Sequence, residues 1–151
     1  MKNYDKYIPW FVGLYILAIA LTVVYFFGLF TTFDKQTGGI IEGSEVRSVY
    51  ILNDNKEVKI TDQETIDRFL NLFKDVKLME VSSSQVHFWN SDYWVTVYVN
   101  NYKKFSFNVY DDQFLSIFDP QKRKDGLKYY RIRSEVDLGV LKDIFNSSPP
   151  I

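Results

Sequence analysis

Residues 8–30 read IPWFVGLYILAIALTVVYFFGLF, and this stretch divides the chain into two parts. No charged side chain occurs between Lys6 and Asp34. With a rise of about 1.5 Å per residue, a helix of this length extends roughly 34 Å, enough to cross a hydrocarbon core of about 30 Å. The stretch therefore predicts a transmembrane helix over residues 8–30, preceded by a short tail of residues 1–7.

The same stretch has two alternative interpretations. The first is a cleaved signal peptide, because residues 18–20 (AIA) resemble a cleavage site. The apolar run continues for ten residues beyond that site, however, so cleavage would leave an insoluble chain end. The second is a buried core helix, but the stretch is apolar on every face and lacks a polar stripe. Tyr and Trp near its ends also favour membrane interfaces. We therefore expect a permanent single-pass anchor in the lipid bilayer.

The charges that flank the stretch bear on its orientation. Lys2 and Lys6 precede it, and Lys35 and Arg47 follow it within about twenty residues. Two basic side chains therefore lie on each side of the stretch, and the N-terminal amine adds a third positive charge before it. This excess favours a cytoplasmic N-terminus. The chain has no cysteine, which excludes a lipoprotein anchor and agrees with either compartment. We expect the C-terminal part to be extracytoplasmic.

The sequence after the anchor is large enough for one domain. Residues 31–44 carry glycines and little periodicity, so we expect a juxtamembrane linker there and a domain over residues 45–148. The net charge of −1 provides no argument for nucleic-acid binding.

Short runs of residues that favour β-structure dominate this domain. Val95, Val97 and Val99 alternate with bulkier or polar residues, as in a strand with two different faces. Residues 53–55 and 100–101 are rich in Asn and Asp, which suit hairpin turns. Strands are expected at residues 45–52, 57–60, 76–81, 85–90, 93–99, 103–110, 114–118 and 127–133.

Two further segments have helical periodicity. In the first, residues 61–64 (TDQE) have the spacing of a capping box with Thr61 as the cap. Ile66, Phe69, Leu70 and Phe73 then form one apolar face, so a helix is expected over residues 62–74. The second segment begins with a similar box at residues 134–137 (SEVD). Its apolar residues are Val136, Val140, Leu141, Ile144 and Phe145.

These elements predict an α+β fold. A single transmembrane helix would be followed by an antiparallel β-sheet, because the connections between strands are short. The two amphipathic helices would pack on one apolar face of that sheet.

A basic segment is the sharpest electrostatic feature of the domain. Residues 121–133 hold six basic residues and one acid, Asp125, a local charge of +5. This segment is either a solvated loop or a surface that contacts anionic lipid headgroups, cell-wall polymers or an acidic partner. Alternation along a strand would send Lys128 and Arg131 to opposite faces. The candidate contact residues are Lys122, Arg123, Lys124, Lys128, Arg131 and Arg133.

Catalytic and metal-binding motifs are not recognisable in the sequence. His87 is the only histidine, and there is no cysteine to complete a metal site with it. Residues 111–112 (DD) read as a turn rather than as a calcium site or an acid–base pair with Asp119. Residues 82–84 (SSS) read as a loop rather than as a nucleophile. We therefore predict no catalytic residue, no cofactor and no metal, and do not expect an enzyme.

The layout resembles small, uncharacterised membrane-anchored extracytoplasmic domains of Gram-positive bacteria. The matching pieces are Tyr50-Ile51, the helix start at residues 60–64 with Ile66 and Leu70, and residues 128–139, which begin Lys-Tyr-Tyr. The resemblance implies a similar fold and location, and it brings no catalytic residues.

The leading hypothesis is a non-catalytic anchored domain that binds a protein partner, as an accessory, sensor or immunity-type subunit. Abundant aromatic residues, which are enriched at protein interfaces, support it. Self-association into a homo-oligomer stays open. The alternatives are binding of an anionic lipid or wall polymer through residues 122–133 and, more remotely, an enzyme.

Overall fold

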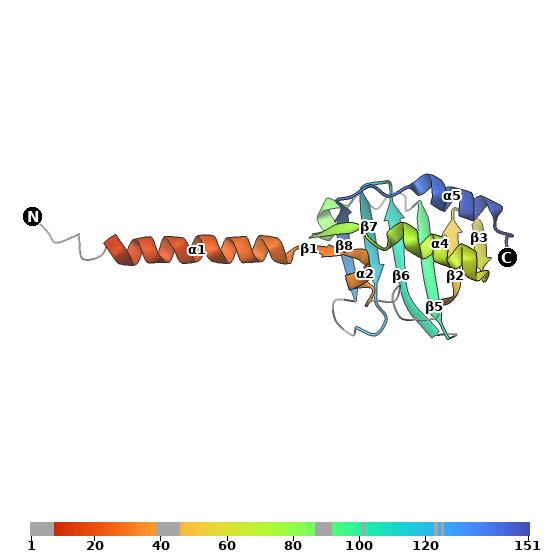
Figure 1. Cartoon of the computed structure of the whole chain (residues 1–151), viewed down its shortest axis with the longest axis horizontal. Helices are drawn as coiled ribbons and strands as arrows, with labels where there is room; N and C mark the ends of the chain where they lie inside the picture. The colour runs from red at the N-terminus through yellow and green to blue at the C-terminus, as the bar shows by residue number, and fades with distance from the viewer. Residues whose placement is uncertain (1–7, 39–45, 87–91, 101, 123, 125) are drawn as a thin grey trace, which may run out of the picture. The chain divides into compact units, whose positions relative to one another are not determined.

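A computed structural model describes residues 8–38, 46–86, 92–100, 102–122, 124 and 126–151. It divides the chain into two compact units, Met1–Phe30 and Thr31–Ile151 (Figure 1). The predicted tail, residues 39–44 of the expected linker, residues 87–90 of the expected strand, and Asn101 lie outside the described residues.

The first unit contains α1 (Ile8–Gly28). Residues Trp10–Gly28 are long and apolar enough to cross a membrane by length and composition, a test that a signal sequence also passes. None of this span is buried, which is unlike the core helix of a soluble domain. The helix is therefore a candidate transmembrane helix.

The second unit is built around an eight-stranded sheet of order β1-β4-β8-β7-β6-β5-β2-β3. Each strand pair from β4 to β3 along this order is antiparallel. The strands are β1 (Phe30–Thr32), β2 (Val46–Asn53), β3 (Lys56–Ile60), β4 (Lys77–Val81), β5 (Tyr93–Val99), β6 (Tyr102–Tyr110), β7 (Phe114–Phe118) and β8 (Leu127–Ile132). The α+β fold with an antiparallel sheet is confirmed.

Two helices cover one face of this sheet, α4 (Gln63–Phe73) and α5 (Leu138–Ser147) (Figure 1). The predicted apolar face of α4 is entirely buried, and Leu141, Ile144 and Phe145 of α5 join the same core. Two short helical turns complete the unit, α2 (Phe33–Gln36) and the 3₁₀ turn η1 (Ser83–Gln85). Gln85 therefore belongs to a helical turn and not to the strand expected from residue 85.

The helix caps differ from the expected ones. Asp62, not Thr61, caps α4, because its carboxylate accepts from both the backbone N–H and the hydroxyl of Thr65, at 2.9 and 2.7 Å. These bonds hold the pKa of Asp62 below its usual range. Asp137, not Ser134, caps α5 by accepting from the N–H of Gly139. The caps follow from where the helices begin, at Gln63 and at Leu138, and the Ser134 hydroxyl instead accepts from the N–H of Lys77 at 3.0 Å.

The expected linker also differs from the structure over residues 31–38. These residues form the end of β1 and the whole of α2, and the side chains of Phe33 and Thr37 are buried. The Phe33 ring lies 5.0 Å from the Phe107 ring and 5.2 Å from the Phe73 ring, measured between centroids. The folded unit therefore begins before the expected boundary at residue 45.

Strand register assigns side chains to the two faces of the sheet. Val95 pairs with Phe107, and both are buried in the core under α4 and α5. The next pair, Trp94 with Asn108, points the other way because side chains alternate along a strand. We call the face turned away from α4 and α5 the outer face.

Candidate functional site

Large apolar side chains are exposed on the outer face. Trp94 is 48% exposed, Leu52 38%, Phe118 39% and Leu127 47%. They lie on four different strands, and the register sets Leu52 opposite Trp94 and Phe118 opposite Leu127. Single exposed apolar residues are ordinary, but a group on one face is typical of an interaction surface.

Two shallow depressions flank Trp94 on this face. Small side chains produce them, since Thr96 and Ser106 form one cross-strand pair between bulkier neighbours. The smaller depression, of about 170 Å³, is lined by Tyr50, Leu52, Glu57, Trp94 and Thr96. The larger, of about 270 Å³, is lined by Trp94, Ser106, Phe107, Asn108, Ser116, Phe118 and Leu127.

The larger depression has a polar floor. Asn108 donates its side-chain N–H to the Tyr110 hydroxyl at 3.1 Å, and that hydroxyl lies 3.3 Å from the Ser116 hydroxyl. The Oδ1 atom of Asn108 is buried and has no hydrogen-bond partner among the described residues. An unpaired buried acceptor is unusual in a folded protein and gives this depression a polar group as well as an aromatic wall.

A second recess gathers three lysines from separate parts of the chain. Lys35 comes from α2, Lys104 from β6, and Lys122 from the loop between β7 and β8. We call this recess, of about 200 Å³, the lysine pocket. Its lining is Lys35, Gln36, Thr37, Gly38, Lys104, Phe105, Asp119, Gln121 and Lys122.

The position of Lys104 follows from an irregularity in the sheet. Val97 pairs with Phe105, but the next residue, Tyr98, pairs with Lys103, so Lys104 is the extra residue on β6. Such a β-bulge redirects a side chain that regular alternation would place elsewhere.

The loop of residues 119–126 positions Lys122. The Asp119 carboxylate accepts from the backbone N–H of Gln121 at 2.9 Å, and the Asp119 carbonyl accepts from the N–H of Lys122 at 3.2 Å. The loop closes tightly at Gly126, where an added Cβ would lie 2.9 Å from two backbone carbonyl oxygens. The Lys122 ammonium lies 3.5 Å from the Asp119 carboxylate.

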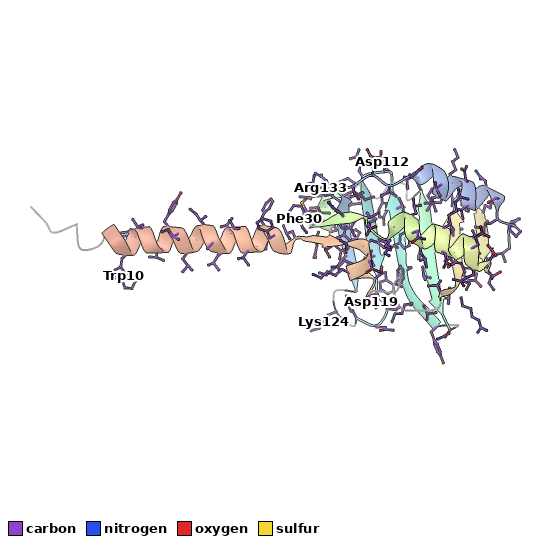
Figure 2. All side chains as sticks on the ribbon, in the orientation of Figure 1. Trp10, Phe30, Asp112, Asp119, Lys124 and Arg133 are labelled. Atoms are coloured by element: carbon purple, nitrogen blue, oxygen red, sulfur yellow. The ribbon has the colours of Figure 1, made fainter. Side chains whose placement is uncertain are left out.

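The structure separates the other basic residues predicted to act together. Lys128 is on the helix-covered side of β8, where its ammonium lies 2.9 Å from the Glu80 carboxylate. Arg131 is on the outer face, with its guanidinium 5.0 Å from the centre of the Phe114 ring. Figure 2 shows Lys124 near Asp119 and Arg133 toward the other end of β8. Arg133 donates to the Met79 sulfur at 3.3 Å, and Arg123 lies outside the described residues.

The catalytic alternatives weighed from the sequence do not converge among the described residues. Asp111 lies in the turn between β6 and β7 with a φ of 54°, and both it and Asp112 are exposed. Asp119 is in the lysine pocket instead, and residues 82–84 contribute to η1. His87 lies outside the part of the chain that the structure describes. In the described ranges, no group of three or more His, Cys, Asp or Glu could hold a metal ion.

Sequence reasoning missed Lys35 and Lys104 because they are 69 residues apart and neither belongs to the basic segment 122–133. The alternation of side chains between the two faces of a strand could have pointed to Trp94 and Phe118. Each is a large apolar residue on the side of its strand opposite the one that the buried apolar residues occupy.

Comparisons of this chain with protein-family models, with curated proteins and with solved structures give no match.

Proposed function

We propose that the chain is a non-catalytic, single-pass membrane protein whose extracytoplasmic domain binds a protein partner through the outer face of its sheet. The observation that carries this proposal is the group of exposed Trp94, Leu52, Phe118 and Leu127 around two depressions. Aromatic residues are enriched in the cores of protein interfaces, and Trp is one of the residue types enriched at binding hot spots.

The dimensions of the face are consistent with such a contact. Eight strands spaced about 4.8 Å apart cover roughly 34 Å, and five-residue strands extend about 17 Å. This footprint is of the same order as the roughly 800 Å² that each partner contributes to a standard interface.

The chemistry of the face indicates what the partner presents to it. Among the described residues that line the two depressions, Glu57 is the one charged side chain, and the rest are apolar, aromatic or neutral polar. A complementary partner surface carries apolar side chains that enter the depressions on either side of Trp94.

Isolation of the full chain from its native membrane in mild detergent tests this proposal. We expect the chain to co-purify with a protein partner, and Trp94→Ala to reduce the recovered partner at least tenfold, about 1.4 kcal/mol. The matched control is Tyr102→Ala, which removes an aromatic side chain that is 79% exposed but lies at the end of β6.

Two outcomes contradict the proposal. One is a chain that elutes alone, with neither partner nor second copy. The other is an equal loss of partner in the Trp94 and Tyr102 variants, because the contact would then not depend on the outer face. Recovery of a second copy alone, lost in the Trp94 variant, would replace the protein partner with self-association.

A further inference from the structure

We propose that the lysine pocket is a binding site for a phosphate-type anion. Three ammonium groups line it, and Asp119 is the only acid among the lining residues that the structure describes. Three positive charges and one negative charge give the described lining side chains a net charge of +2. Lysine is a common phosphate ligand because its compact charge approaches the anion from any direction.

The acid in the pocket is already engaged. Asp119 pairs with Lys122 at 3.5 Å and accepts from the backbone N–H of Gln121 at 2.9 Å. Within the described ranges, no ion pair is found for Lys35 or Lys104, so their charges remain available to an anion. The repulsion between these like charges is relieved when an anion binds between them.

The shape of the pocket limits the size of its ligand. Phe105, which is buried in the core, forms one wall, and Gln36 and Thr37 of the α2 region form another. The recess has a volume of about 200 Å³, which is enough to admit a phosphate group. Three lysines that converge on one recess suit a single compact anion better than an extended acidic surface.

This site differs from the basic segment predicted from the sequence. It uses Lys122 of that segment and joins it to Lys35 and Lys104, while Lys128 and Arg131 take part in other contacts. Lys35 is the first basic residue after the apolar stretch in the sequence. If α1 spans a bilayer, as the proposed function requires, an anionic lipid headgroup is one source of the phosphate. A free phosphate ester is the other, and it does not depend on that proposal.

A titration tests the site with the full chain in maltoside micelles, which contain no phosphate. Inorganic phosphate is added at constant ionic strength while the backbone amides of Gly38, Lys104 and Lys122 are followed by NMR. We expect the chemical shifts of these amides to change saturably with phosphate concentration. The phosphate affinity should fall at least tenfold in Lys104→Gln and in Lys35→Gln. The matched control is Lys142→Gln, an exposed lysine of α5, which we expect to change the affinity less than twofold.

Nanodiscs distinguish the two sources of phosphate. If a lipid headgroup is the ligand, the same amides shift in phosphatidylglycerol nanodiscs relative to phosphatidylcholine nanodiscs, and the shift is absent in Lys104→Gln. If a free phosphate ester is the ligand, the amides respond to inorganic phosphate and not to the lipid.

The proposal is overturned if the amides show no saturable response to phosphate and no lipid-dependent shift. It is also overturned if Lys142→Gln weakens binding as much as Lys104→Gln, because the effect would then come from overall charge. Loss of partner binding in the Trp94 variant is independent of both results, so the two proposals fail separately.

Discussion

Tyr130 shows how one residue joins distant parts of the domain. It is among the largest fully buried side chains, and its hydroxyl donates to Oε1 of Gln36 at 2.8 Å. This bond connects β8 to α2 across 94 residues of sequence. Burial raises the pKa of the Tyr130 phenol, and the nearby Glu80 carboxylate raises it further.

This raised pKa predicts a stability change at alkaline pH. The folded state keeps the Tyr130 proton at a pH where the unfolded chain has released it. The stabilisation is therefore complete below about pH 10 and is lost as pH rises from there toward the folded pKa, by up to about 1.4 kcal/mol per pH unit. Tyr130→Phe removes this loss and costs about 1 kcal/mol at neutral pH, because Gln36 loses its donor.

Urea unfolding of the full chain in detergent between pH 7 and 11 measures this effect. We expect the free energies of unfolding of the wild type and Tyr130→Phe to converge above pH 10. Tyr102→Phe, an exposed tyrosine, serves as the control and should follow the wild type throughout. Parallel curves for wild type and Tyr130→Phe would show that Tyr130 is not the linked group.

At the scale of elements, α2 is held in place by tertiary contacts. A helix of four residues has no stability of its own, because nucleation costs more than so few hydrogen bonds return. Its position depends on the burial of Phe33 against Phe73 and Phe107, and on the Phe33 N–H that donates to the Val76 carbonyl at 2.9 Å. The contact that fixes this element also places Lys35 in the lysine pocket.

Two deletions test where the folded unit begins. Removal of residues 1–30 should leave a domain that unfolds cooperatively, because its core lies within residues 31–151. Removal of residues 1–38 also deletes Phe33, whose loss alone costs about 3–5 kcal/mol, so we expect a much lower urea midpoint or no folded state. Equal midpoints for the two deletions would restore the linker interpretation of residues 31–38.

At the scale of the whole molecule, the apolar helix and the α+β domain are separate compact units. The proposed function gives them one purpose, to present the outer face of the sheet at a membrane surface. Lys2 and Lys6 before α1 balance Lys35 and Arg47 after it, and the N-terminal amine adds one positive charge that favours a cytoplasmic N-terminus.

Single cysteines test this orientation, because the chain has none of its own. Asn146→Cys places a thiol on an exposed position of α5, and Asn3→Cys places one before the apolar stretch. In intact cells we expect a membrane-impermeant maleimide to label Cys at position 146 and to label position 3 only after permeabilisation. The reverse pattern would invert the proposed topology, and labelling of a secreted chain would support the signal-peptide alternative.

The fold class was predictable because its evidence is local. Apolar periodicity identified α4, and alternation identified β5 and β6 to within a residue. The N-cap residue of α4 was harder to predict, because Thr61 and Asp62 are adjacent acceptors and only the geometry of the folded helix selects between them. The order of strands was not predictable, since it depends on pairings such as β2 with β5 that join residues about 50 positions apart.

The sequence by itself determined the division into an apolar stretch and a domain, the α+β class and the absence of a recognisable catalytic motif. Each of these depends on composition or on short-range periodicity. Only the tertiary structure brought Lys35, Lys104 and Lys122 to one pocket and placed Trp94 beside Leu52 and Phe118 on one face. The reason is physical: strand pairing and burial of the core bring together residues that no local pattern connects. Both candidate binding surfaces are products of that long-range packing.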